Sequence, residues 1–89
     1  ACTEGPRFET AAEVRMFRML GAQIIGMTLV PEAPLARDLG LHYAAIGIIS
    51  NYCTGMTSYV SDEDIEGVIT NMRESVFEIC FRLIRQNCE

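Results

Sequence analysis

The chain has 89 residues, 49% of them hydrophobic, and a formal net charge of −5 at pH 7. Its seven basic residues form no cluster, so it lacks the positive patch of a nucleic-acid surface, and nucleic acid is excluded as a partner. No stretch reaches the roughly 18 uninterrupted apolar residues of a membrane span, so no membrane association is expected. The length suits one small domain, but the apolar content exceeds what such a domain can hide. We therefore expect the chain to pack against another surface.

Four cysteines are scattered along the chain without any CxxC pair: Cys2, Cys53, Cys80 and Cys88. This spacing indicates neither a zinc site nor a thioredoxin-like motif, and we expect mainly buried thiols and no metal. On one continuous helix Cys80 and Cys88 would lie about 12 Å apart along the axis, which is too far for a disulfide.

A turn near the start of the chain interrupts a strand. Gly5 and Pro6 end the regular structure of the first residues, because glycine tolerates strained dihedral angles and proline removes a backbone donor. Thr10 then starts a helix, since its hydroxyl can cap the first turn and Glu13 follows at the spacing of a capping box. Glu9 is thereby held at the helix start, where it either complements the positive helix end or faces a ligand. A start in mid-strand, with neither an initiator methionine nor a signal peptide, leads us to expect a piece of a longer protein.

Two helices and one strand are predicted next. Residues 10–20 form an amphipathic helix, because apolar residues recur there every three or four positions, and Gly21 closes it. Residues 23–27 are a short apolar run with β-branched residues, typical of a strand buried on both faces. A second helix covers residues 31–39, with Pro31 suited to its first turn.

A strand, a loop and a long helix are predicted for the rest of the chain. Residues 41–50 are nearly all apolar and have the length and branching of a central strand. Residues 52–60 show no periodicity and predict a loop, which we expect to move. Residues 61–87 predict a helix that Ser61 caps and that carries acidic residues in its first turn. Its apolar stripe is wider than one neighbouring element would cover.

Strands and helices that alternate with short connections predict an α/β fold. In such sheets ligands bind outside the carboxyl ends of the strands. Convergence of the three predicted strand ends would gather four side chains around one ligand: Glu9, Met27, Thr28 and Asn51.

Several short motifs stand out along the chain: Glu4-Gly5-Pro6-Arg7-Phe8-Glu9-Thr10, Ala12-Glu13, Leu20-Gly21-Ala22, Gly26-Met27-Thr28, Val30-Pro31-Glu32, Ala36-Arg37, Gly40-Leu41 and Asn51. In residue type and spacing they resemble the trimeric purine nucleoside phosphorylase and methylthioadenosine phosphorylase family. The resemblance runs from residue 1 to about residue 65, continues more weakly through the last helix, and covers only the C-terminal portion of the family's chain. It implies a three-layer αβα fold with a central mixed sheet. Residues 1–89 would be the C-terminal portion of that single domain, incomplete alone.

The resemblance also implies a function. A purine nucleoside phosphorylase cleaves the N-glycosidic bond of a purine nucleoside with inorganic phosphate, giving a free base and a sugar 1-phosphate. Phosphate is a co-substrate, and neither a metal nor an organic cofactor is needed. The family's amino-terminal part supplies further phosphate ligands, so we expect the isolated fragment to be inactive. The implied enzyme is cytoplasmic, serves purine salvage and assembles as a homotrimer or a dimer of trimers.

Five residues receive roles from this resemblance. Asn51 matches the catalytic amide that donates to N7 and O6 of the departing purine, and Glu9 matches the acid that accepts from N1–H of a 6-oxopurine. Phe8 lies beside the base, Met27 under the ribose, and the Thr28 hydroxyl serves phosphate. Taken singly, each has a simpler reading: Asn51 as a turn residue, Met27 as core and Thr28 as a helix cap.

Two alternatives stay open. The enzyme could act on S-methyl-5'-thioadenosine or methylthioinosine, because relatives that prefer a 5'-hydroxyl commonly carry a histidine where Asp62 or a neighbour stands here. The pair Glu9 and Asn51 favours 6-oxopurines, since adenine reverses the donor and acceptor at N1 and at position 6. The chain could also be a non-catalytic fragment that binds purines or serves subunit assembly. His42 is expected to be structural, and the acids at 63 and 64 are expected to complement the helix dipole.

Overall fold

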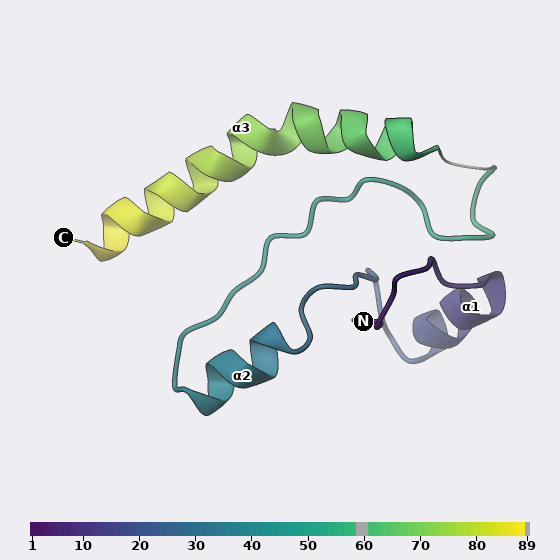
Figure 1. Ribbon diagram of the computed structural model, residues 1–89, viewed down its shortest axis with the longest axis horizontal. Helices are drawn as coiled ribbons and strands as arrows, with labels where there is room; N and C mark the ends of the chain where they lie inside the picture. The colour runs from purple at the N-terminus through teal and green to yellow at the C-terminus, as the bar shows by residue number, and fades with distance from the viewer. Residues whose placement is uncertain (59–60, 89) are drawn as a thin grey trace. The chain divides into compact units, whose positions relative to one another are not determined.

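Three helices follow one another along the chain in the computed structural model, which describes residues 1–58 and 61–88: α1 (Ala11–Met19), α2 (Glu32–Asp38) and α3 (Asp62–Asn87) (Figure 1). They belong to two units. Ala1–Ala45 and Tyr52–Tyr59 form the first unit, and Ile46–Asn51 and Val60–Glu89 form the second. α1 and α2 therefore lie in the first unit and α3 in the second.

The amino-terminal end of α1 has the capping box that the sequence predicts. The backbone N–H of Glu13 donates to Oγ1 of Thr10 at 3.2 Å, and the backbone N–H of Thr10 donates to Oε1 of Glu13 at 3.4 Å. At the other end Gly21, with φ +90°, donates to the carbonyl of Arg18 at 3.0 Å. Val14 provides the buried face of this helix. Both ends of α1 are thus fixed by contacts within a few residues.

α2 is short and is closed in the same way at its carboxyl end. Leu41 N–H donates to the Ala36 carbonyl at 2.8 Å, across Gly40 with φ +69°. Ala36 is the buried residue of the helix. The Tyr43 hydroxyl donates to Oε2 of Glu32 at 3.1 Å. Burial and this contact with the Glu32 carboxylate both raise the pKa of Tyr43 above its ordinary value, with burial the larger cause.

The predicted strands over residues 23–27 and 41–50 are wrong for the part of the chain that the structure describes, where no strand forms. One parallel bridge joins Cys2 to Gly26. In it Thr3 N–H donates to the Gly26 carbonyl at 2.8 Å, and Gly26 N–H donates to the Ala1 carbonyl at 3.0 Å. A strand is held by hydrogen bonds to neighbours on its edges, and the apolar run 41–50 meets no such neighbour among the described residues.

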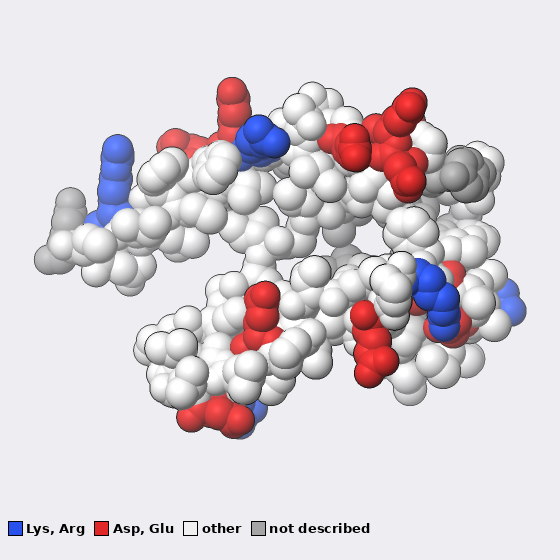
Figure 2. Space-filling model, in the orientation of Figure 1, with Lys and Arg blue, Asp and Glu red and all other residues white. Residues whose placement is uncertain are grey.

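α3 begins with a second capping box and buries none of its residues. Asp64 N–H donates to the Ser61 hydroxyl oxygen at 3.2 Å, and Ser61 N–H donates to Oδ2 of Asp64 at 3.1 Å. Figure 2 shows acidic side chains gathered over the first turn of α3, as expected from complementing the helix dipole. The rings of Phe77 and Phe81 lie 6.5 Å apart, and both side chains are more than half exposed.

The prediction that the chain has more apolar surface than it can hide is confirmed. Within residues 1–58 and 61–88 the buried hydrophobic residues are Val14 and Ala36, whereas large exposed ones occur along both units. In the same ranges no helix is long and apolar enough to span a membrane. Burial of so few side chains gives little hydrophobic stabilisation.

The four cysteines are free thiols, and the expectation that they are mainly buried is wrong. Cys2, Cys53 and Cys80 are partly exposed and Cys88 is exposed, because the surrounding segments bury little surface. Residues 52–58 of the predicted loop have no regular structure, and residues 59 and 60 of that loop lie outside the described residues.

Candidate active site

Glu9 is the acidic residue that the fold removes from water. Its side chain is 7% exposed, which makes it the buried charged residue of the described chain. Oε1 of Glu9 accepts a hydrogen bond of 2.7 Å from the hydroxyl of Thr3. A buried carboxylate is costly unless it is hydrogen-bonded, so this contact is what makes the placement of Glu9 tolerable.

The turn before α1 is held in place by Arg7. Its guanidinium lies 3.1 Å from Oε1 of Glu13 and also donates to Oε2 at 3.3 Å and to the Phe8 carbonyl at 3.0 Å. The hydrogen bond from Arg7, and next the one from Thr10, lower the pKa of Glu13 below its ordinary value. Phe8 itself is 55% exposed, so its ring is open to a ligand that stacks beside it.

Met27 contacts the same turn. The bridge between Cys2 and Gly26 brings the residues after Gly26 beside the amino-terminal segment. A Cβ atom on Gly5 would meet the Met27 sulfur at 3.0 Å, so the thioether packs directly against the glycine backbone. Phe8, Glu9 and Met27 all lie in the first unit, and Met27 packs against Gly5 of the same turn.

Thr28 and Asn51 are placed less tightly. Thr28 follows Met27 and is exposed. Asn51 is half-buried and belongs to the second unit, whereas Glu9 belongs to the first. The Ser50 hydroxyl donates to Oδ1 of Asn51 at 2.7 Å.

A pocket of about 240 Å³ lies at the Glu9 turn, and its lining is mostly polar: Thr3, Glu4, Gly5, Arg7, Glu9 and Glu13. A buried acceptor in this lining suits a ligand that offers an N–H donor. No group of three or more His, Cys, Asp or Glu side chains that could hold a metal ion occurs in residues 1–58 and 61–88.

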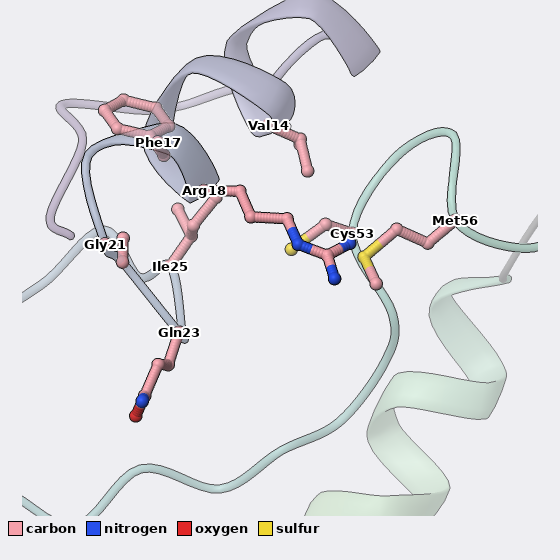
Figure 3. Close-up of a pocket in the computed structure, with 9 residues that line it drawn as sticks. Val14, Phe17, Arg18, Gly21, Gln23, Ile25, Cys53 and Met56 are labelled. Carbon is pink, nitrogen blue, oxygen red and sulfur yellow. The ribbon is translucent and has the colours of Figure 1, made fainter.

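A larger pocket of about 410 Å³ lies beside α1 and holds none of the predicted site residues (Figure 3). Its walls are mainly apolar, and Figure 3 shows the Arg18 side chain extended from α1 toward Cys53 and Met56. The smaller pocket differs from it in holding a buried, hydrogen-bonded carboxylate, that of Glu9.

Two residues that contact the acids of this turn have no predicted role in the sequence analysis: Thr3 and Arg7. The available signals were a hydroxyl residue and a cation, each six positions before the acid it contacts: Glu9 for Thr3 and Glu13 for Arg7. A separation of six residues is not characteristic of contacts within a helix or a strand, so only the shape of the turn brings each pair together.

Comparison with known proteins adds two findings. The sequence pattern of the Phosphorylase superfamily matches residues 1–85 of the chain. A protein from Pyrococcus furiosus named "6-oxopurine nucleoside phosphorylase" is 59% identical over 56 residues, which are 63% of this chain and 21% of that protein.

Two further relatives align over nearly all of the chain. A "Probable 6-oxopurine nucleoside phosphorylase" from Moorella thermoacetica is 43% identical over 94 residues, covering 99% of this chain and 36% of that protein. A "Probable S-methyl-5'-thioinosine phosphorylase" from Thermodesulfovibrio yellowstonii is 42% identical over 80 residues, covering 90% of this chain and 29% of that protein. The chain thus spans between 21% and 36% of the length of these three relatives.

Proposed function

This chain belongs to the phosphorylase superfamily, and from that premise we propose that the natural protein containing it cleaves purine nucleosides with inorganic phosphate. The products are a free purine base and a sugar 1-phosphate. Purine nucleosides with a 6-oxo group are the preferred substrates. The names of relatives that are 43% to 59% identical support this class of reaction.

The single observation that carries the proposal is the buried carboxylate of Glu9, hydrogen-bonded to Thr3 and directly after the exposed Phe8 in the chain. A 6-oxopurine presents N1–H to that carboxylate, and its planar ring can lie against the phenyl ring. Adenine presents a lone pair at N1 instead, which leaves the buried anion without a donor. Sites built on such hydrogen bonds discriminate by as much as ~10⁴.

Asn51, Met27 and Thr28 complete the proposed site. Negative charge grows on the purine as the glycosidic bond breaks, and the Asn51 amide N–H groups would stabilise it at N7 and O6. Met27 would lie under the ribose, and the Thr28 hydroxyl would donate to phosphate. Asn51 is the residue we propose as catalytic, because its donors would act on the atoms where charge develops.

The proposed fold explains the unpaired apolar run at 41–50. In a three-layer αβα architecture with a central mixed sheet, that run and residues 23–27 would gain strand neighbours from the rest of the domain. The proposed enzyme is a homotrimer or a dimer of trimers in the cytoplasm. It uses phosphate as co-substrate and no organic cofactor.

A second substrate is favoured by one specific observation. The relative from Thermodesulfovibrio yellowstonii is named for S-methyl-5'-thioinosine, and it aligns over 90% of this chain. Its base is also a 6-oxopurine, so Glu9 and Asn51 suit it equally well. The two substrates differ only at the 5' position of the sugar.

The test is phosphorolysis by the natural protein that contains this chain. Inosine, guanosine, S-methyl-5'-thioinosine and adenosine are compared at equal phosphate concentration, with release of the free base as the readout. We expect at least one 6-oxo nucleoside to be cleaved far more efficiently than adenosine. Asn51→Asp should lower activity on inosine and raise the relative rate on adenosine, because a carboxylate accepts from the 6-amino group.

Two results would contradict the proposal. Equal efficiency on adenosine and on the 6-oxo nucleosides would refute the specificity argument while leaving the reaction intact. Purine binding without any base release would instead show a non-catalytic purine-binding protein.

A further inference from the structure

The hydrogen bond between Thr3 and Glu9 engages only one of the two oxygens of the buried Glu9 carboxylate. Oε1 accepts from the Thr3 hydroxyl at 2.7 Å. Oε2 accepts no hydrogen bond from residues 1–58 and 61–88. Every fully buried side-chain oxygen in those ranges has a partner, so Oε2 must keep some exposure. Because Glu9 and Thr3 both line the pocket, we take Oε2 as the oxygen that reaches it.

The direction of this bond matters for recognition. The Thr3 hydroxyl donates, so the Glu9 carboxylate acts as an acceptor in this bond, and N1–H of a 6-oxopurine is a donor that its other oxygen can accept from. A 6-aminopurine offers a lone pair at N1 instead. Keeping Glu9 an acceptor is thus what excludes the wrong base.

Backbone contacts fix the donor. Thr3 N–H donates to the Gly26 carbonyl at 2.8 Å, and the neighbouring Cys2 forms the parallel bridge with Gly26. The backbone at and before Thr3 is therefore held by a segment more than twenty residues away. The Thr3 hydroxyl reaches Glu9 across the turn from this fixed backbone.

We propose that Thr3 is a positioning residue that sets base specificity: it engages Oε1 of Glu9, so that Oε2 is presented to N1–H of a 6-oxopurine. This role rests on the proposed phosphorolysis. In this proposal Thr3 acts through Glu9.

The experiment uses the natural protein that contains this chain and three variants. Thr3→Val keeps the shape and removes the hydroxyl, and Thr3→Ser keeps the hydroxyl. Thr70→Val makes the same chemical change on the exposed surface of α3 and serves as the matched control. For each protein, kcat and KM are measured for inosine, adenosine and phosphate, and thermal unfolding is recorded.

We expect Thr3→Val to lower kcat/KM for inosine by about 10- to 100-fold, the range for a lost hydrogen bond to a charged group. The inosine-to-adenosine ratio of kcat/KM should fall with it, and the KM for phosphate should stay unchanged. Thr3→Ser should recover most of the inosine activity, and Thr70→Val should behave as wild type.

Failure of this inference is distinct from failure of the proposed function. If the wild type prefers 6-oxo nucleosides and Thr3→Val keeps the wild-type inosine-to-adenosine ratio, Thr3 has no part in specificity. A parallel loss for inosine, adenosine and phosphate that Ser does not rescue would also overturn the proposal, because it indicates a structural role only. A wild type that cleaves no purine nucleoside would refute the phosphorolysis itself, and the role of Thr3 with it.

Discussion

Gly5 and Met27 are in direct contact: a Cβ atom on Gly5 would lie 3.0 Å from the sulfur of Met27. Gly5 also has φ +66°, a conformation that costs other residues roughly 1 kcal/mol or more. We expect Gly5→Ala in the natural protein to lower stability and to displace Met27, which would raise the KM for the nucleoside. Steady-state kinetics together with thermal unfolding would measure both effects.

Gly40 provides the control for that substitution. It has nearly the same φ, +69°, but a Cβ there would meet no atom within 4 Å. Gly40→Ala should therefore show the backbone cost without the effect on nucleoside KM. Equal nucleoside KM values in the two variants would show that the contact with Met27 is irrelevant to the site.

The ion pair of Arg7 and Glu13 predicts a pH dependence of stability. The pKa of Glu13 is lowered in the folded state, mainly by the Arg7 hydrogen bond. The pair therefore stabilises the folded protein above the ordinary pKa of glutamate, and this contribution is lost as the pH falls through the lower folded-state pKa. Arg7→Gln should lower the unfolding temperature slightly near pH 7, and the difference from wild type should vanish in acid. The effect is small because both side chains face solvent.

Arg73→Gln is the matched control for Arg7→Gln. Arg73 lies exposed on α3 and makes no ion pair within the described residues. Its replacement should leave the shape of the pH profile unchanged. A pH-independent difference between Arg7→Gln and wild type would show that Arg7 acts through its bond to the Phe8 carbonyl alone.

Thr28 is proposed to donate its hydroxyl to phosphate. Thr28→Val keeps the side-chain volume and removes the donor, so the apparent affinity for phosphate should weaken by roughly 1–2 kcal/mol. That loss corresponds to a roughly 5- to 30-fold rise in the KM for phosphate. Unchanged phosphate KM and turnover would show that Thr28 has no part in phosphate binding, and Thr70→Val again provides the control.

The isolated 89-residue chain should be neither stably folded nor active. Its buried hydrophobic residues within the described ranges are Val14 and Ala36, which cannot offset the conformational entropy of ordering the chain. Circular dichroism on heating should show a gradual loss of helix without a cooperative transition. A sharp transition accompanied by phosphorolysis of inosine would contradict this prediction.

The helices could be predicted from the sequence because their signals are local. Thr10 with Glu13 and Ser61 with Asp64 are capping pairs three residues apart, and the structure has both. The strands could not be predicted reliably from local signals. Residues 41–50 have the composition of a strand, but a strand also needs backbone partners from other segments. Composition reports how apolar a segment is, and pairing depends on what lies beside it.

The candidate site shows the same division. Placement of Glu9 near the start of α1 followed from the capping pattern, whereas its burial and its bond to Thr3 did not. The bridge from Cys2 to Gly26, which holds the backbone before Thr3, joins positions 24 residues apart and was not predicted. The location of Asn51 was predicted from a strand end and its role from the family resemblance; no strand forms at 41–50 within the described residues, and the role stays a prediction.

The capping boxes also have a consequence for the order of folding. Helix formation takes well under a microsecond in short peptides, whereas closing long loops and pairing distant segments is slower. A peptide of residues 61–88 should therefore show measurable helix content by circular dichroism, which Ser61→Ala should reduce. The bridge between Cys2 and Gly26 joins distant positions, so it should form after the helical turns. In refolding of the natural protein the helices would accordingly be ordered before residues 1–3 pair with Gly26.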